Sequence, residues 1–137
     1  MTTFLFWNLM GNAVGSWPAR SATLRTHIAQ MASSFGVDVF VFVESGFDPV
    51  DLLMALNQVN RGVYCYPPSA NKRIQIITRF DPSALTERYD SEDDRLTIRS
   101  LTTKTTTILL GGIHFQSQTY WTPSEQAAEA QVLRKEH

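Results

Sequence analysis

The stretch Val37–Glu44 decides the fold of this chain. It reads Val-Asp-Val-Phe-Val-Phe-Val-Glu, a run of β-branched and aromatic residues that ends in a carboxylate. Such residues favour strands, and a run that stays apolar without alternation indicates a strand that is covered on both faces. We therefore expect a buried strand between two layers, with Glu44 at its C-terminal end.

The residues before this stretch predict a second buried strand and a helix. Phe4–Trp7 is an apolar run that stops at Asn8 and is followed by glycines and a proline, as in a strand that leads into a loop. From Ser21 to Gly36 apolar residues recur at helical spacing, and the glycine is typical of a helix end. The apolar stripe of this helix consists of Leu24, Ile28, Met31 and Phe35.

The residues that follow Glu44 predict another helix. Asp48 is a good N-cap and Pro49 suits the first helical position, and apolar residues at helical spacing continue to Gly62. Tyr64–Tyr66, which contains the single cysteine Cys65, is interpreted as a short buried strand.

The second half of the chain is rich in strands. Strand-like runs with short links and no helix between them are Ile74–Thr78, Leu96–Ile98 and Thr107–Leu110. Thr102–Lys104 is typical of a hairpin turn, so antiparallel pairing is expected, and the acidic stretch Asp90–Asp94 is expected in an exposed loop. Thr122–Glu125 is a capping box that predicts a last helix. The fold class is therefore α+β, with a mixed, largely antiparallel β-sheet and flanking helices.

Composition and charge disfavour several classes of protein. The chain has 137 residues, 43% of them hydrophobic, which suffices for one modest core. A net charge of −1 gives no general positive surface, so a large nucleic-acid target is disfavoured, whereas a local basic groove stays possible. The N-terminus lacks the features of a signal peptide and no apolar run reaches membrane-spanning length, so a cytoplasmic protein is expected.

Polar residues follow both of the buried strands of the first half. Asn8 and Glu44 each stand at a strand's C-terminal end, where an uncompensated carboxylate would be costly. A divalent cation is one solution, and a carboxylate with an amide oxygen and water suits Mg²⁺. The alternative is that Glu44 caps the loop at Ser45 and Asn8 makes a turn; the residues alone do not decide between the two.

His114 is a third polar residue at a strand end, directly after Gly111–Ile113. A histidine at this place can protonate a leaving oxygen or bind a phosphoryl oxygen, because its pKa ordinarily lies near neutrality. A lone histidine in a strand is more often structural. The two glycines before it allow close backbone approach or a bulge, which favours a functional role.

These fragments together resemble the endonuclease/exonuclease/phosphatase superfamily, whose members have the deoxyribonuclease I-like fold. Phe4–Met10 resembles the family's first strand, and Val37–Glu44 resembles its second motif, with Val43 where glutamine is common. Asp94–Leu96 and Gly112–Phe115 are similar to its paired central strands. The resemblance implies half of a four-layer α/β/β/α sandwich that exposes one sheet face.

The resemblance also implies roles for the candidate residues. Glu44 would bind Mg²⁺, or Mn²⁺ in its place, Asn8 would contact metal and phosphate, Arg95 would bind phosphate, and His114 would act catalytically near the scissile bond. The implied function is a Mg-dependent phosphoester hydrolase, that is, a phosphodiesterase, nuclease or phosphatase. The substrate, whether nucleic acid, nucleotide, phosphoinositide or sphingomyelin, is left open.

Two later motifs of the family, Gly-Asp-Phe-Asn and Ser-Asp-His, do not occur in residues 1–137. We therefore expect this chain to be the N-terminal half of such a domain. Its partner is then the C-terminal half, in the same gene or as a separate chain, or a second copy bound through the exposed sheet. The competing interpretations are an inactive binding or assembly module that retains the half-fold, and an unrelated α/β domain that only echoes the motifs.

Overall fold

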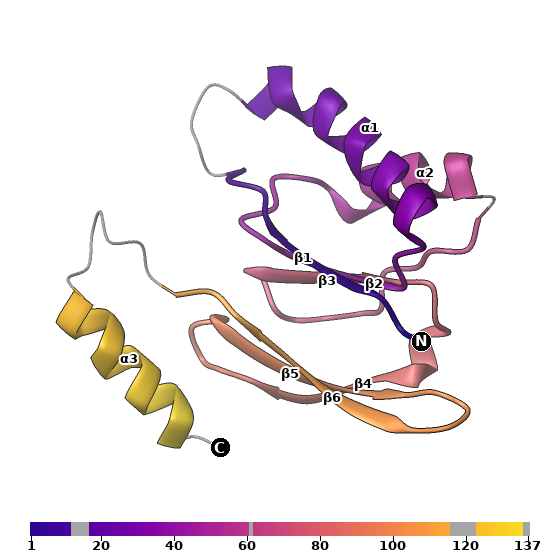
Figure 1. Cartoon of the computed structure of the whole chain (residues 1–137). Helices are drawn as coiled ribbons and strands as arrows, with labels where there is room; N and C mark the ends of the chain where they lie inside the picture. Colours follow the sequence, from indigo (N-terminus) through magenta and orange to yellow (C-terminus); the bar gives the residue numbers. More distant parts are fainter. Residues whose placement is uncertain (12–16, 61, 116–122, 136–137) are drawn as a thin grey trace.

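Two small sheets and three helices make up the part of the chain that the structure, a computed structural model, describes (Figure 1). This part comprises residues 1–11, 17–60, 62–115 and 123–135. Sheet A has the order β1 (Phe4–Asn8), β2 (Val39–Val43), β3 (Ile74–Thr78), and sheet B the order β4 (Leu85–Asp90), β5 (Leu96–Thr102), β6 (Thr107–Ile113). The helices are α1 (Trp17–Phe35), α2 (Pro49–Asn60) and α3 (Pro123–Lys135), and a short 3-10 helix, η1 (Pro82–Ala84), precedes β4.

The strand pairing confirms the predicted α+β class. β1 and β2 are parallel and are joined by α1, as a parallel pair requires a crossover connection. Every other pair is antiparallel: β2 with β3, β4 with β5, and β5 with β6. The sheets are therefore mixed but largely antiparallel.

Strand β2 is buried along its whole length and separates two cores. Phe40 and Phe42 belong to the core under the helices, where their rings stack with centroids 5.3 Å apart. The valines of β2 project to the other face, because successive side chains of a strand alternate. They form the second core with apolar residues of β3, β4 and β5, so the two sheets pack face to face. The members of this second core are Val39, Val41, Val43, Ile74, Ile76, Leu85 and Leu101.

Several details of the fold differ from those predicted from the sequence. Strand β4 was not predicted, because its sequence Leu-Thr-Glu-Arg-Tyr-Asp is mostly polar and it becomes a strand only by pairing with β5. The prediction of an exposed loop at Asp90–Asp94 was wrong at its start, because Asp90 ends β4 and Ser91 is buried. Phe35 was expected on the apolar stripe of α1, yet it is 68% exposed. Cys65 makes only an isolated bridge to Thr78 and no strand.

Helix boundaries follow the local signals more closely. Asp48 caps α2 through its Oδ1, which accepts a hydrogen bond of 2.8 Å from the N–H of Val50. α1 begins at Trp17, four residues before the predicted start at Ser21. α3 begins at Pro123 as expected, while the predicted cap Thr122 lies outside the described residues. No helix of the described part is long and apolar enough to cross a membrane.

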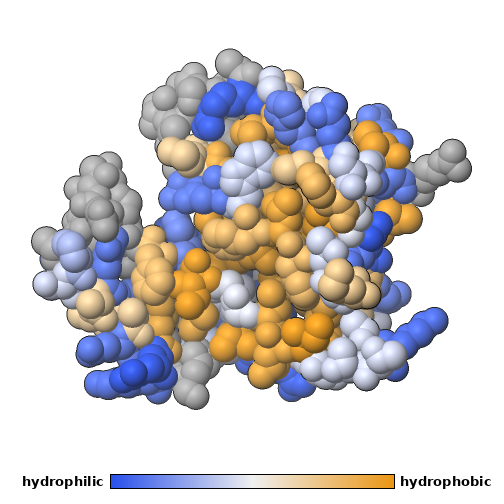
Figure 2. Space-filling model, viewed as in Figure 1, coloured by the Kyte–Doolittle hydropathy of each residue, from blue (hydrophilic) through white to orange (hydrophobic). Residues whose placement is uncertain are grey.

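The strands β1 and β6 leave apolar side chains exposed. Each is an edge strand of its sheet, and Figure 1 shows both on the near side of the molecule. Figure 2, from the same viewpoint, shows a broad apolar surface there. Phe4 and Phe6 on β1 are 39% and 56% exposed, and Leu109 and Ile113 on β6 are 69% and 42% exposed. We call this surface the open side; it runs along two strand edges, whereas the sequence predicted one exposed sheet face.

The loop after β1 lies against the residues that follow β2. The N–H of Gly11 donates to the carbonyl oxygen of Glu44 over 2.6 Å. A Cβ on Gly11 would lie 2.5 Å from that oxygen and closer still to the backbone nitrogen of Gly46. Only glycine allows this approach, which places the chain after Asn8 next to Glu44.

We predict that Gly11→Ala destabilises the fold and shifts the backbone at Glu44. The new methyl group would meet main-chain atoms that cannot move aside alone, and overpacking of this kind costs about 1–3 kcal/mol. Urea denaturation midpoints measure the effect. Gly111→Ala is the matched control, because a Cβ there has nothing within 4 Å. Equal midpoints for the two variants would contradict the packing described here.

Candidate active site

The predicted residues Glu44 and His114 lie side by side although 70 positions separate them. Glu44 follows β2 in sheet A and His114 follows β6 in sheet B. His114 Nε2 and Glu44 Oε1 are 2.9 Å apart, within hydrogen-bonding distance, and the two side chains are 13% and 24% exposed. A wide separation of Asn8, Glu44 and His114 would have established the unrelated-domain interpretation, and Glu44 and His114 are not separated.

Gly112 brings the two sheets together just before His114. A Cβ on Gly112 would lie 3.2 Å from Thr97 Cγ2 and 3.3 Å from Ile74 Cγ2. Both contacts are tighter than ordinary packing, so the missing side chain lets β6 approach sheet A closely. Gly112 therefore serves close approach, one of the two uses that the sequence allowed, whereas a Cβ on Gly111 would have open space.

Asn8 lies at the same edge of sheet A as Glu44, since it is the register partner of Val43 in the parallel pair. Its Oδ1 accepts a hydrogen bond of 2.9 Å from the N–H of Met10, and its side chain is exposed. This is the turn that the alternative interpretation of Asn8 expected. Asn8 thus lies near the site, but its side-chain oxygen is already hydrogen-bonded to the backbone of Met10.

Arg95 lies next to His114 and is held by an acidic neighbour. Its carbonyl oxygen accepts from the N–H of His114 over 2.8 Å, and its Nη1 donates to the carbonyl oxygen of His114 over 3.3 Å. Its Nε lies 3.5 Å from Asp93 Oδ2. Arg95 therefore fixes the chain at His114, and its predicted contact with phosphate remains a prediction.

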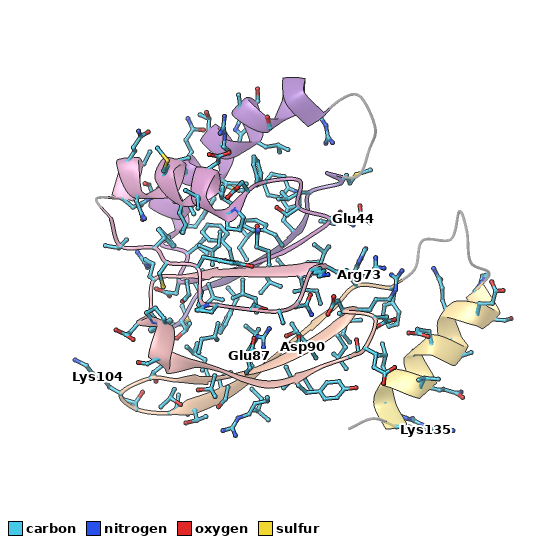
Figure 3. All side chains as sticks on the ribbon, turned by 180° about the vertical axis from the view of Figure 1, so that it is seen from behind. Glu44, Arg73, Glu87, Asp90, Lys104 and Lys135 are labelled. Atoms are coloured by element: carbon cyan, nitrogen blue, oxygen red, sulfur yellow. The ribbon has the colours of Figure 1, made fainter. Side chains whose placement is uncertain are left out.

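A cavity of about 360 Å³ opens beside Glu44 and His114. Its lining residues are Glu44, Ser45, Tyr66, Asn71, Lys72, Arg73, Ile74, Gln75 and His114. Figure 3 shows Glu44 and Arg73 near each other, on the side of the two sheets that is far from Lys104. The sequence analysis missed residues 71–73; the signal that could have found them is a basic pair placed directly before a buried strand.

Charge and burial differ among the lining residues. Glu44 is the single carboxylate of the lining, and Lys72 and Arg73 are permanent cations. Burial raises the pKa of Tyr66, partly opposed by the charge of Arg99, so its phenol stays protonated and can donate at neutral pH. In the described part of the chain, His114 Nδ1 is buried without a hydrogen-bond partner. The cavity thus offers donors and positive charge that suit an anionic ligand.

The donor set fits a sparsely ligated Mg²⁺ ion. Among the described residues no group of three or more His, Cys, Asp or Glu side chains could enclose a metal ion. A closed zinc or calcium site is therefore not formed by these residues. Mg²⁺ keeps several waters and needs only one or two carboxylates, so Glu44 with nearby amide oxygens satisfies its chemistry. Glu44 also has a positive φ of 50°, an uncommon conformation that often occurs at functional sites.

Comparison with known proteins supports the fold. No protein-family model matches the chain, and no curated protein matches it either. An endonuclease/exonuclease/phosphatase family protein from Leptotrichia buccalis matches with a TM-score of 0.61, 13% identity and 96% of this chain covered. Humanized TDP2 from D. rerio matches with a TM-score of 0.57, and D. rerio TDP2 complexed with single strand DNA product with 0.58; each is 15% identical over 96% of this chain.

The chain spans only about half of these structures. It covers 61% of the L. buccalis protein and 54% and 52% of the two TDP2 chains. At such low identity the likeness concerns the fold alone. The chain therefore shares the fold of these structures over about half of their length, in agreement with the fold that the sequence motifs predicted.

Proposed function

We propose that this chain forms the N-terminal half, residues 1–137, of a Mg²⁺-dependent phosphoester hydrolase of the endonuclease/exonuclease/phosphatase type. The observation that carries the proposal is the 2.9 Å contact between Glu44 and His114, which joins the ends of two strands from different sheets. Packing does not require a carboxylate and an imidazole at this position beside a cavity with two cations. The structural neighbours, which include a protein with that family's name, support the same type of chemistry.

The proposed roles follow from the positions of the side chains. Glu44 holds Mg²⁺, or Mn²⁺ in its place, and Asn8 can contribute once its carbonyl oxygen leaves Met10 N–H. When bound, the ion would supply positive charge against the charge that develops on the phosphoryl oxygens. His114 is the proposed general acid: its Nε2 lies against Glu44 Oε1, which orients the imidazole, and it can serve a leaving oxygen once the substrate displaces that contact. The base that activates water is assigned to the remaining half of the fold.

The open side supports a partner for this chain. The accessible surface of the whole chain is 8282 Å², whereas a compact monomer of this mass has about 7,200 Å². The excess is comparable to the roughly 800 Å² that each partner buries in an ordinary interface. We propose that a C-terminal half, in the same gene or as a separate chain, adds strands to β1 and β6, whose edges can pair with new strands.

An inactive binding or assembly module is the second candidate function. Several polar groups near the site already have local partners, which favours this alternative. Asn8 Oδ1 accepts from Met10, and Arg95 is paired with Asp93. Metal binding separates the two candidates, because only the hydrolase needs Glu44 as a ligand.

We predict that the wild-type chain binds Mg²⁺ or Mn²⁺ and that Glu44→Ala weakens this binding at least about tenfold, or roughly 1.4 kcal/mol. The reason is the loss of the single carboxylate of the cavity. Calorimetric titration measures the affinity. Asp51→Ala, which removes an exposed carboxylate from α2, is the control and leaves the affinity unchanged. Equal affinity for wild type and Glu44→Ala would favour the inactive module.

We predict no turnover of bis(p-nitrophenyl) phosphate with Mg²⁺ by the isolated chain, because the proposal assigns the water-activating base to a C-terminal half. Release of p-nitrophenolate measures the rate. In a preparation completed by a C-terminal half, His114→Ala lowers the rate by about 10² to 10⁴, the range of a general acid. Turnover by the isolated chain would reject the half-fold proposal.

We predict that the isolated chain self-associates through the open side and that Phe6→Glu reduces this association. A charge on β1 opposes burial of the apolar edge. Sedimentation velocity measures the oligomer fraction. Val59→Glu is the matched control, because Val59 is 54% exposed on α2, close to the 56% of Phe6. Equal effects of both variants would show that general charge, and not the open side, governs association.

A further inference from the structure

Lys72 and Arg73 form a basic pair in the wall of the cavity that also contains Glu44 and His114. Among the residues that the structure describes, neither of them makes an ion pair with a side chain. The Nε of Arg73 donates to the carbonyl oxygen of Asp93 over 2.8 Å, and the backbone N–H of Lys72 donates to Asp94 Oδ2 over 3.3 Å. These bonds engage the Lys72 backbone and the Arg73 Nε, and within the described residues no hydrogen bond or ion pair engages the Lys72 ammonium or the Arg73 Nη atoms.

The buried Asn71 determines the course of the chain at this pair. It is 6% exposed, and its Oδ1 accepts from the N–H of Arg73 over 3.0 Å and of Ile74 over 2.8 Å. Its Nδ2 donates to Asp90 Oδ1 over 2.9 Å. An asparagine that binds the backbone two and three residues ahead fixes a turn. Lys72 lies inside that turn, so the position of its backbone is set by the fold.

A buried arginine anchors the turn to sheet B. Arg99 is 3% exposed, and its Nη1 and Nη2 donate to the two carboxylate oxygens of Asp90 over 3.3 and 3.4 Å. Its Nη2 also donates to Ser69 Oγ over 2.9 Å, and that oxygen accepts from the N–H of Asn71 over 3.1 Å. A buried ion pair contributes little net stability but needs a defined geometry. This network makes residues 69–73 a preformed wall.

Two acidic groups, Asp93 and Asp94, lie near the wall, and only the first of them is paired with a cation outside the basic pair. Burial alone would raise the pKa of Asp93, but hydrogen bonds from Ser91 and from the Arg95 N–H, together with the charge of Arg95, lower it. Asp93 is therefore ionised at neutral pH, and its charge is balanced by Arg95. Asp94 is engaged through the backbone of Lys72. Within the cavity lining two permanent cations face the single carboxylate Glu44.

We propose that Lys72 and Arg73 form a second anion subsite, which binds a phosphoryl group adjacent to the one at Glu44 and His114. This inference rests on the proposed hydrolase function and narrows its substrates to compounds with two neighbouring phosphoryl groups. An arginine fork and a lysine are the usual partners of phosphate oxygens, and the preformed turn reduces the entropy lost on binding. A simple phosphomonoester uses only half of this cavity.

The subsite is tested by titrating the ¹⁵N-labelled chain with inorganic pyrophosphate and, separately, with inorganic phosphate. Pyrophosphate is expected to shift the amide signals of residues 69–75 and to bind more tightly than phosphate. The double variant Lys72→Gln, Arg73→Gln is expected to weaken pyrophosphate binding at least about tenfold. Both side chains are exposed and the Asn71 turn remains, so the variant keeps the fold apart from the lost hydrogen bond between Arg73 Nε and the Asp93 carbonyl oxygen. Lys104→Gln, at the far hairpin, is the matched control with unchanged binding.

Three outcomes separate the interpretations. Equal loss of affinity in Lys104→Gln, or no preference for pyrophosphate over phosphate, overturns the subsite. Tight pyrophosphate binding that depends on Lys72 and Arg73, with metal binding that does not depend on Glu44, keeps the subsite and rejects the hydrolase proposal. Metal binding that depends on Glu44, with pyrophosphate binding that does not depend on Lys72 and Arg73, keeps the hydrolase proposal and rejects the subsite.

A further pair of probes identifies the source of the second phosphoryl group. Binding of ADP is compared with binding of the dinucleotide pTpT, with AMP as the reference that carries one phosphoryl group. Preference for ADP indicates a diphosphate linkage, and preference for pTpT indicates successive phosphates of a strand. Either preference supports the subsite. If neither ligand binds more tightly than AMP, the subsite is overturned.

Discussion

The burial of β2 on both faces is the constraint on which the rest of the structure depends. Its phenylalanines pack under α1 and α2 while its valines pack against sheet B, so a single strand belongs to both cores. Each such side chain contributes about 1.5–3 kcal/mol relative to an exposed position. A one-residue shift of β2 would exchange the two sets of side chains between the two cores, so the register is strongly specified. Glu44, which follows directly, is therefore held at a defined point of the sheet edge.

The site depends on contacts between elements that are distant in the sequence. Glu44 comes from sheet A, His114 from sheet B, and residues 71–73 from the connection that precedes β3. Gly112 lets the sheets come close enough for the first two to meet. Asn71, Asp90 and Arg99 connect the third segment to sheet B through hydrogen bonds with little exposure to water. Loss of sheet packing would thus separate the acid, the histidine and the cations at once.

The open side gives this small protein a large exposed apolar surface at two strand edges. Two terminal strands carry unpaired backbone edges and exposed aromatic and aliphatic side chains (Figure 2). Natural proteins usually protect such edges with charge, bulges or a covering element. Here β4 carries charged residues and a register shift between Glu87 and Tyr89, whereas β1 is almost entirely apolar. The edge at β4 is therefore protected, whereas the edges at β1 and β6 are not. These two unprotected edges can pair with further strands.

The sequence by itself determined the strands whose character is set locally and the polar residues that end them. The β-branched and aromatic run Val39–Val43 predicted a buried strand, and Asn8, Glu44 and His114 were found because each ends a strand-like run. The strand β1 was also expected to be buried, but alternate side chains of it are exposed. Only the tertiary structure decided that Glu44 meets His114, that Asn8 turns back on Met10, and that Asn71–Arg73 line the same cavity. The polar strand β4 and the buried Arg99 were decided in the same way. The physical reason is that periodicity reports what one segment buries, whereas pairing, ion pairs and cavities depend on which segment lies opposite.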